Sequence, residues 1–418
     1  MEHESTLSDA LLRQLIAVGQ VDVLVGLPTL NNAATIVEIV RAIHVSFNRD
    51  FPRLRTVLIN SDGGSTDGTP ELIRAASFTD ADTVQTSHQL RTSHRVLAPY
   101  HGLPGKHTAL HTLFAAGELT QAKVLVVIDP SGPTTTGERV SELVGPVARA
   151  DVDFLAPRYR RHPRDGVLIT QLVRPLVRAL YGVALDEPLG TEFACSGRFA
   201  SHSLEQEIWN QEAARFAIDL WLRAEAVVEQ FPIGQIWRPS PTASSTRTTL
   251  RDVVRQVVMS LVEDLHLHES FWVKTDGISA LPTWGVDPSL TPGVAAWDYQ
   301  TLAEQARHDI VELKPLLEEV LGAELVARLM DERKAASQPD DELWVRIVYS
   351  FLAASHLGRV GHEQLADMFV PLYMWRASAF MAGTAAETDA AVQIRLDSLC
   401  DAFHRLKPAL VASWSTGV

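Results

Sequence analysis

The stretch LRTVLINSDGGSTDGTPELI, residues 54–73, predicts a strand, a glycine-rich turn and a helix in direct succession. The apolar, β-branched run up to Asp62 is typical of a buried strand. Pro70 suits the first turn of a helix, because the N–H that it lacks would have no partner there. The glycines let a ligand approach the backbone, and the Asp62 carboxylate can accept hydrogen bonds from it. The alternative is a plain strand–helix turn in which Asp67 caps the helix.

Strands and helices alternate through the first 129 residues. The apolar runs predict strands over residues 21–28, 54–62, 94–100 and 123–129 and helices over 31–47, 70–76 and 105–119, with Asn31 or Asn32 as a helix cap. This alternation predicts an α/β fold with a parallel, doubly wound sheet that is covered on both faces. Ligands bind such sheets beyond the carboxyl ends of the strands, where Pro28, Asp62 and Asp129 fall.

A change of pattern then divides the chain. Residues 150–240 are mixed, with a strand predicted at 151–159 and helices at 170–182 and 215–229. The segment 238–249 is rich in Pro, Ser and Thr and has loop composition, and helical periodicity dominates beyond it. We therefore expect an α/β domain over residues 1–240 and an all-helical domain over residues 241–418.

Composition excludes several classes of protein. A formal net charge of −14 argues against a nucleic-acid binder, and two cysteines, Cys195 and Cys400, fit a reducing compartment. The polar N-terminus does not look like a signal peptide, and no run of 18 uncharged apolar residues predicts a transmembrane segment. We expect a soluble, cytoplasmic protein. The basic amphipathic helix at 170–182 leaves a peripheral membrane contact open.

Several motifs in order resemble a known family. LPTLNNAATIVEIVRAI (27–43), INSDGGSTDGT (59–69) and GKHTAL (105–110), followed by a strand that ends in an acid, resemble nucleotide-diphosphosugar glycosyltransferases of GT-A type. The stretches 157–182 and 187–197, and the helical tail, are similar to the retaining branch that includes mannosylglycerate and glucosylglycerate synthases. The resemblance implies a Rossmann-like GT-A domain followed by a helical part.

The resemblance also implies site residues. Asp62 corresponds to an acid that contacts the base or ribose, Lys106 to a lysine near the diphosphate, Glu192 to an acid in the sugar pocket and Asp219 to an acid beside the acceptor. Glu192 and Asp219 are thus the implied catalytic residues. The implied donor-binding residues are Pro28, Thr29, Asn31, Asp62, Gly63, Lys106, Asp129 and Gly190.

The implied metal site departs from the family pattern. Asp129 matches the first acid of the family's Asp-x-Asp motif, but Ser131 stands in place of the second. A further histidine ligand is expected near residues 239–250, which contain none, and Ser244 or Ser245 stands about where it would be. A hydroxyl is a poor substitute for a carboxylate toward Mg²⁺ or Mn²⁺. Weak cation binding, replacement of the cation by Arg or Lys, and lost turnover all remain open.

Basic side chains gather in PRYRRHPRDG, residues 157–166. They indicate either a site for a carboxylate acceptor or phosphate, or a solvated basic loop. Guanidinium groups pair well with phosphates and stay charged. The candidates for an acceptor or phosphate contact are Arg158, Arg161 and Arg247, and Arg160 and Arg251 are further candidates for replacing a metal.

The sequence thus predicts a retaining glycosyltransferase that moves glucose or mannose from a nucleotide-sugar to a small hydroxylated acceptor such as D-glycerate. Two alternatives are a cell-wall or lipid-linked acceptor, and a non-catalytic member that binds a nucleotide or sugar. The partners expected are the nucleotide-sugar and the acceptor, with a homodimer left open. Trp344, Arg346, Tyr373, Trp375 and Arg376 are expected to be packing residues, and Cys195 a buried one.

Overall fold

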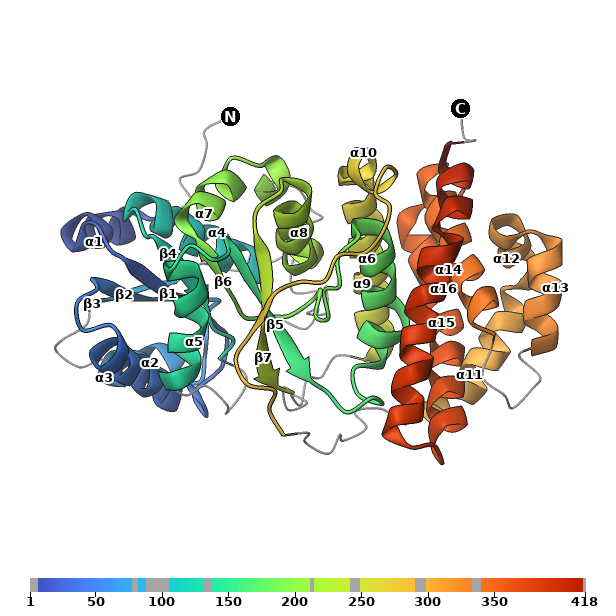
Figure 1. Cartoon of the computed structure of the whole chain (residues 1–418), viewed down its shortest axis with the longest axis horizontal. Helices are drawn as coiled ribbons and strands as arrows, with labels where there is room; N and C mark the ends of the chain where they lie inside the picture. Colours follow the sequence, from blue (N-terminus) through green and yellow to red (C-terminus); the bar gives the residue numbers. More distant parts are fainter. Residues whose placement is uncertain are drawn as a thin grey trace. The chain divides into compact units, whose positions relative to one another are not determined.

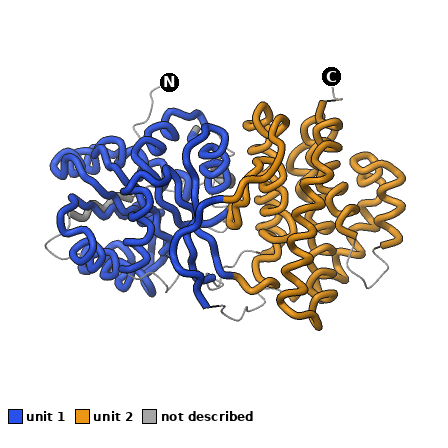
Figure 2. The backbone as a smooth tube through the Cα atoms, in the orientation of Figure 1, with its two compact units in different colours: residues 1–160, 189–247, 281–289 blue, residues 161–188, 248–280, 290–418 orange. Residues whose placement is uncertain are grey.

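A computed structural model of the chain describes residues 7–76, 82–87, 105–130, 137–210, 214–240, 249–289, 298–332 and 340–415. It divides into two compact units (Figure 2). Unit 1 comprises Met1–Arg160, Leu189–Arg247 and Leu281–Ser289, and unit 2 comprises Arg161–Pro188, Thr248–Ala280 and Leu290–Val418. The main change of unit thus falls near the boundary expected at residue 240. Two segments depart from that simple division: 161–188 packs with the helical unit, and 281–289 packs with the sheet.

Unit 1 is built around a sheet to which eight described strands contribute, in the order β3-β2-β1-β4-β6-β5-β7-β8 (Figure 1). The strands are β1 (Val23–Thr29), β2 (Thr56–Asp62), β3 (Asp82–Ser87), β4 (Val124–Val127), β5 (Phe154–Arg160), β6 (Phe193–Ser196), β7 (Ile233–Pro239) and β8 (Thr283–Trp284). β6 runs antiparallel to β4 and β5, and the other pairs are parallel. The predicted mostly parallel, doubly wound sheet is therefore confirmed. Strand order reverses between β1 and β4, which is the switch point where such sheets bind ligands.

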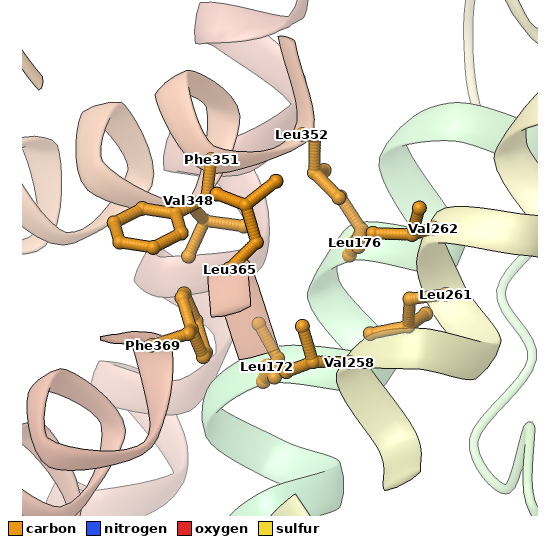
Figure 3. Close-up of a pocket in the computed structure, with 10 residues that line it drawn as sticks. All are labelled: Leu172, Leu176, Val258, Leu261, Val262, Val348, Phe351, Leu352, Leu365 and Phe369. Carbon is orange, nitrogen blue, oxygen red and sulfur yellow. The ribbon is translucent and has the colours of Figure 1, made fainter. Parts of the chain in front are cut away.

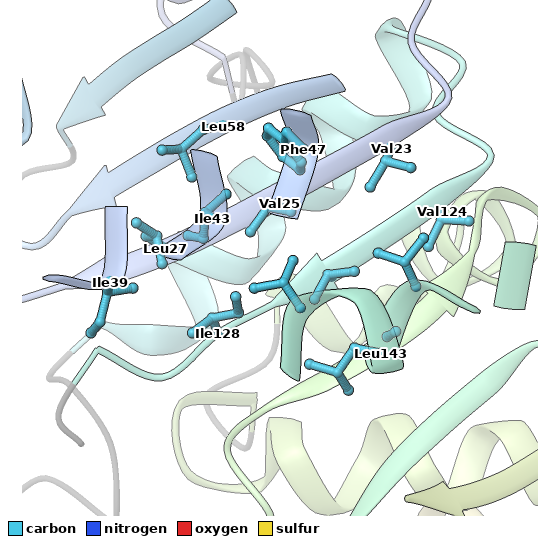
Figure 4. Packing of buried hydrophobic residues seen from close by; sticks show 14 of the residues in the cluster. Val23, Val25, Leu27, Ile39, Ile43, Phe47, Leu58, Val124, Ile128 and Leu143 are labelled. Atoms are coloured by element: carbon cyan, nitrogen blue, oxygen red, sulfur yellow. The ribbon is translucent and has the colours of Figure 1, made fainter. Parts of the chain in front are cut away.

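Helices cover both faces of this sheet. On one face, α2 (Ile36–Asp50), α3 (Thr69–Ala76) and α5 (Gly137–Ala148) bury their apolar stripes against alternate residues of β1, β2 and β4 (Figure 4). Leu27, Ile43 and Leu143 are each 1% exposed or less. On the other face lie α4 (Lys106–Leu119), α7 (Gly197–Leu204) and α8 (Ala214–Val228), which contact one another. α1 (Asp9–Val18) precedes the sheet.

Several predicted elements differ in detail from those observed. β3, β6, β7 and β8 were not predicted, and the strand predicted at 94–100 lies outside the described residues. α2 begins at Ile36 rather than at residue 31, and neither predicted asparagine caps it through its side chain. Asn31 has a left-handed φ of 57°, and the Asn32 carbonyl accepts the N–H groups of Thr35 and Ile36 at 3.0 Å. The asparagines therefore shape the turn before the helix.

Unit 2 is helical, as predicted for the tail. After a π-helical turn η2 (Ile169–Val173), its helices are α6 (Arg174–Tyr181), α9 (Leu250–Leu267), α10 (Glu269–Trp272), α11 (Tyr299–Glu312), α12 (Lys314–Leu321), α13 (Ala323–Glu332), α14 (Asp341–His356), α15 (His362–Thr384) and α16 (Asp389–Ser415). α6 packs on α16, and α15 packs on α9 and α11. The predicted packing role is confirmed for Trp344, Tyr373, Trp375 and Arg376, which are 2% exposed or less, whereas Arg346 is exposed.

The membrane contact considered for residues 170–182 does not fit this packing. In α6, Leu176, Val177 and Leu180 are buried inside unit 2, so the apolar face of the helix is already covered. No helix in the described ranges has the length and apolar character needed to cross a bilayer.

An apolar pocket lies within unit 2, between η2–α6, α9, α14 and α15 (Figure 3). Aliphatic and phenyl side chains form its lining: Leu172, Leu176, Val258, Leu261, Val262, Val348, Phe351, Leu352, Leu365 and Phe369. Because nothing polar lines it, it offers no partner for a hydrogen-bonding ligand and is a gap in helix packing.

Candidate functional site

The turn after β2 is organised by the Asp62 carboxylate. Oδ1 accepts the hydroxyls of Thr29 (2.8 Å) and Ser65 (2.6 Å), and Oδ2 accepts the N–H groups of Gly64 (3.0 Å) and Ser65 (2.8 Å). Four bonds fill the acceptor capacity of a carboxylate, and Asp62 is only 2% exposed. The predicted contact of Asp62 with a base or ribose would therefore have to displace one of these bonds.

A buried polar chain connects this turn to β1. The Asn60 amide donates to the Thr29 hydroxyl (2.7 Å) and to the Leu27 carbonyl (3.1 Å), and Thr29 in turn donates to Asp62. The Gly63 N–H donates to the Thr29 carbonyl at 2.8 Å. Of the predicted donor-binding residues, Thr29, Asp62 and Gly63 are thus brought together, and Pro28 lies beside Ser61 in the β1–β2 register.

Asn31 holds the next turn in place and remains exposed. Its N–H donates to Ser65 Oγ at 2.8 Å, and its Oδ1 accepts the Thr66 N–H at 2.9 Å. Asp67 accepts the N–H and hydroxyl of Thr69 at the start of α3, at 3.1 and 2.6 Å. These bonds match the helix-capping interpretation of Asp67. Although burial opposes the shift, the bonds from Thr69 and from the Ala33 N–H lower the pKa of Asp67.

Asp129 follows β4 at the switch point and is half-buried. The next residue, Pro130, accepts the Thr35 hydroxyl at 2.5 Å, which ties the end of β4 to the start of α2. Ser131, Ser244 and Ser245 lie outside the described residues. In the described ranges, no three His, Cys, Asp or Glu side chains gather so as to hold a metal ion. Among the described residues Asp129 is therefore the one predicted ligand, and a single carboxylate does not fit a Mg²⁺ or Mn²⁺ centre built by the protein alone.

Lys106 and Asp219, predicted to act separately, form a buried ion pair. The Lys106 ammonium opens α4 and lies 2.6 Å from both carboxylate oxygens of Asp219 on α8. The two side chains are 9% and 3% exposed. A phosphate contact by Lys106 would require the ammonium to leave, or to share, this partner.

Gly190 packs against β5 and supports the same helix. A Cβ at this position would lie 2.4 Å from Pro157 Cγ, so only glycine fits here. The Gly190 carbonyl accepts Arg223 Nη2 at 2.6 Å, and Arg223 Nη1 donates to the Asp219 carbonyl at 2.6 Å. The predicted approach of a sugar to Gly190 stays a prediction, because the contacts observed are with the chain itself.

Glu192 lies beside an arginine that the sequence analysis did not identify. Arg238, at the end of β7 and 2% exposed, donates through Nε to Glu192 Oε1 (3.0 Å), through Nη1 to Glu142 Oε2 (2.7 Å) and through Nη2 to the Arg139 carbonyl (2.9 Å). The charges of Glu192 and Arg238 also act on a second guanidinium, that of Arg139 on α5. The signal that could have found Arg238 is the short stretch IGQIW (233–237) directly before it, with apolar Ile233, Ile236 and Trp237.

The basic stretch 157–166 is divided between the units. In unit 1, the Arg158 guanidinium lies 4.3 Å from the centre of the Trp237 ring, and Arg160 pairs with Asp287 at 3.4 Å. In unit 2, Arg161 makes a two-pronged pair with Glu187 at 2.5 and 2.9 Å. Arg161 therefore fits neither of the two predictions for this stretch, an open anion site or a solvated loop. Arg247 lies outside the described residues, and Arg251 pairs with Asp309.

Fold and site together define a class: a doubly wound α/β protein with a polar site at the carboxyl edge of its sheet. Within unit 1, the site combines the Asp62 turn, Asp129, the Lys106–Asp219 pair and the Glu192–Arg238 pair. Carboxylates and held cations at one edge can bind a ligand that carries both hydroxyls and negative charge.

Comparisons with known proteins found similarity at the level of structure. No protein-family model matches the chain, and no curated protein matches it. Its structure is similar to that of a GT-A glycosyltransferase, glucosyl-3-phosphoglycerate synthase from Mycobacterium tuberculosis, at 23% identity and a TM-score of 0.41 over 61% of this chain and 84% of that chain.

Two further structures of that synthase carry ligands. One is in complex with Mg²⁺ and UDP (22% identity, TM-score 0.42, covering 61% of this chain and 82% of that one). The other is in complex with Mn²⁺, UDP-glucose and phosphoglyceric acid (21% identity, TM-score 0.42, covering 64% and 85%). At these values the likeness does not by itself indicate an activity for this chain.

Proposed function

We propose that the chain is a retaining glycosyltransferase that moves glucose or mannose from a nucleotide-diphosphosugar to a small hydroxylated acceptor such as D-glycerate. The observation that carries the proposal is the gathering of charges at the carboxyl edge of the sheet. The group comprises three cations and two carboxylates of one unit: Arg238 and Glu192 at strand ends, Lys106 and Arg139 in the first turns of α4 and α5, and Asp219 on α8.

Sugar transfer needs charges of both signs. The bond between the anomeric carbon and the diphosphate oxygen breaks, and the acceptor oxygen forms a new bond to that carbon as its hydroxyl gives its proton to the departing diphosphate oxygen. Positive charge develops at the anomeric carbon and negative charge on the departing diphosphate. Fixed carboxylates stabilise the first and fixed cations the second, because they are already oriented when the charge develops.

The proposed roles follow from position. Glu192, held by Arg238, faces the anomeric carbon, and Asp219, held by Lys106, orients acceptor or sugar hydroxyls. Pro28, Thr29, Asn31, Asp62 and Gly63 surround the nucleotide, and Asp129 lies beside its diphosphate. Arg158 and Arg247 are the proposed contacts of an anionic acceptor; Arg161, also predicted for this role, is instead held by Glu187 within unit 2.

Mg²⁺ or Mn²⁺ is proposed as an optional cofactor, to be tested against its absence. A cytoplasmic location and a homodimer also remain proposals, and no nucleic acid is expected as a partner. UDP-glucose, D-glycerate and 3-phosphoglycerate are the first compounds to test, since the similar synthase has been solved with UDP-glucose and phosphoglyceric acid.

Calorimetric titration tests the donor site directly. Purified protein is titrated with UDP, GDP, UDP-glucose and GDP-mannose, each with Mn²⁺ and with EDTA. Saturable binding of one nucleotide and its sugar conjugate is expected. If none of these compounds binds in either buffer, the proposed glycosyltransferase function is wrong, and the chain shares only the fold.

A second candidate is a non-catalytic nucleotide or sugar binder. It is favoured by the saturation of Asp62 with bonds from its own chain and by the mutual neutralisation of Lys106 and Asp219. Incubation with the bound donor and D-glycerate, 3-phosphoglycerate or a lipid-linked acceptor separates the two. A glycosylated product with retained anomeric configuration supports the enzyme, and a lipid-linked product the cell-wall alternative. Binding without any product supports the binder.

A further inference from the structure

The charges around Glu192 do not balance inside the protein. Arg238 and Glu192 are both well covered, with side chains 2% and 16% exposed, and neutralise one another. Glu142, the second acid of the group, is 46% exposed, so water screens its charge. The Arg139 guanidinium is therefore a positive charge without a buried counterpart.

Arg139 has no acceptor for its side chain within the described residues. Its carbonyl accepts Arg238 Nη2 at 2.9 Å, whereas its guanidinium makes no hydrogen bond or ion pair with a described residue. Its side chain is half-buried near the start of α5. Burial lowers the pKa of Arg139, the Arg238 charge lowers it further and Glu192 opposes both, yet an arginine stays charged in proteins. A half-buried guanidinium without a partner gains free energy when an anion pairs with it.

The strand register places this group next to Asp129. Val127 of β4 pairs with Phe193 of antiparallel β6. Continued past the ends of these two strands, the same register would bring Ile128 opposite Glu192 and, one residue further, Asp129 opposite Thr191. β4 keeps its alignment this far, because the Ile128 N–H still donates to the Gly26 carbonyl of β1 at 3.1 Å. Glu192, Arg238 and Arg139 therefore adjoin the position at which the family resemblance places the metal-bound diphosphate.

We propose that Arg139, held in place by Arg238 and Glu192, supplies the positive charge that binds the donor diphosphate, in the place of a divalent cation. This inference rests on the proposed function. It accounts for the exchange of the second acid of the motif for Ser131 and for the lack of a three-ligand cluster in the described part of the site.

The chemistry requires no metal. As the anomeric carbon–oxygen bond breaks, both bonding electrons stay on the diphosphate oxygen, and the departing group gains negative charge. Two parallel N–H groups of a guanidinium match two phosphate oxygens and strengthen as that charge grows. Arg238 does not contact the diphosphate in this scheme. It is a positioning residue whose bonds to Glu192 and to the Arg139 carbonyl fix the acid and α5.

The test measures UDP and uridine binding by calorimetry in EDTA and in Mn²⁺. Wild-type protein should bind UDP in EDTA with an affinity that Mn²⁺ changes by less than about threefold. Arg139→Met should weaken UDP binding by about tenfold or more, the effect of losing a charge-assisted contact, and leave uridine binding unchanged. Arg139→Lys keeps the positive charge but loses the two parallel N–H donors, so its UDP affinity should lie between those of wild type and Arg139→Met.

Arg149→Met is the matched control. Arg149 follows α5 directly, is 60% exposed and pairs with Asp151 at 3.0 Å, so its loss should leave both affinities unchanged. Equal UDP affinity in wild type and Arg139→Met, or an absolute need for Mn²⁺, would overturn the inference while leaving the glycosyltransferase proposal intact. Failure of wild type to bind any nucleotide would overturn both. Circular dichroism of each variant establishes that a lost affinity is not lost folding.

Discussion

Lys106 and Asp219 form a pair in which each buried charge depends on the other. Asp219→Asn or Lys106→Met alone should lower the free energy of unfolding by about 3–5 kcal/mol, because each leaves an uncompensated charge out of water. The double variant should lose clearly less than the sum of the two. Urea unfolding of the four proteins in the cycle measures this coupling.

An exposed pair provides the control for that cycle. Lys123 lies 2.7 Å from Asp22 but is 76% exposed, so Lys123→Met should cost less than about 1 kcal/mol. Strict additivity of the two buried substitutions would show that Lys106 and Asp219 do not depend on one another, and would contradict the pairing.

His111 on α4 should make the stability of unit 1 depend on pH. Its ring stacks on Trp209 with centroids 4.8 Å apart, and burial lowers the pKa of His111 from 6.5 to about 4. Because the fold favours the neutral ring, this contribution is complete above pH 6.5 and is lost as pH falls toward 4. It is on the order of 2–3 kcal/mol once partial exposure is allowed for.

The pH series includes His111→Phe, which keeps the ring contact without the titration. Thermal melts between pH 7.5 and 4 should show a shallower loss of stability in this variant than in wild type. Identical slopes would mean that protonation of His111 is not coupled to folding.

At the residue scale, the sequence predicted positions better than partners. Pro28, Thr29 and Asp62 lie at strand ends as expected, because an apolar run that stops at a polar residue marks a strand end locally. That Lys106 would meet Asp219, 113 positions later, depends on how α4 and α8 pack, which no local pattern encodes. Arg238 was missed for the same reason: its partners come from α5 and from the residues before β6.

At the scale of elements, α7 approaches the start of β4 so closely that one added carbon matters. A Cβ on Gly197 would lie 2.2 Å from the Ala122 carbonyl oxygen, and the Gly197 N–H donates to the Lys123 carbonyl at 2.9 Å. Gly197→Ala should therefore destabilise unit 1 by about 1–3 kcal/mol, since the backbone that it meets cannot rotate away. Urea unfolding measures the change.

Gly361→Ala is the comparison for that substitution. No atom lies within 4 Å of a Cβ at this position, and its φ of −63° suits any residue. Its effect should stay within about 1 kcal/mol, because Gly361 is the N-cap of α15 and alanine is a poorer N-cap than glycine. A Gly197→Ala protein as stable as Gly361→Ala would contradict the close contact between α7 and β4.

The elements that the sequence did not predict share a physical cause. Gly234 and Gln235 interrupt the apolar residues of β7, and β6 is only four residues long, so neither has the continuous apolar run that revealed the other strands. The helix expected over 31–47 starts five residues late, because Asn31 and Asn32 direct their side chains to Thr66 and Leu30 instead of capping it. The asparagine side chains thus make hydrogen bonds within the turn instead of capping α2.

At the scale of the whole molecule, the sequence predicted two architectures but not their interleaving. The change from alternating to helical periodicity near residue 240 lies close to Arg247, where unit 1 gives way to unit 2. The segment Arg161–Pro188 was assigned to the sheet domain because it precedes the Pro-, Ser- and Thr-rich boundary at 238–249. Its helix α6 instead buries its apolar face against α16, more than 200 residues away in the chain. Which core receives an amphipathic helix is decided by tertiary packing, not by its own pattern.

Because each unit has a hydrophobic core of its own, scanning calorimetry should resolve two transitions rather than one. Two substitutions identify them. Gly197→Ala should lower the transition temperature of unit 1 and leave that of unit 2 unchanged. Val258→Ile adds one carbon to the apolar pocket of unit 2. It should raise the transition temperature of unit 2 alone and add about 0.5–1 kcal/mol to its free energy of unfolding, if the pocket has room for the carbon.

The sign of the Val258→Ile effect distinguishes a true gap from a close-packed region, because an extra carbon without room forces neighbouring side chains out of their rotamers and destabilises. Val345→Ile is the control: Val345 is on α14, fully buried and outside the pocket lining, so overpacking should lower the unit 2 transition there. A single transition that both Gly197→Ala and Val258→Ile displace would mean that the two cores melt as one cooperative body, and that the division into units has no thermodynamic counterpart.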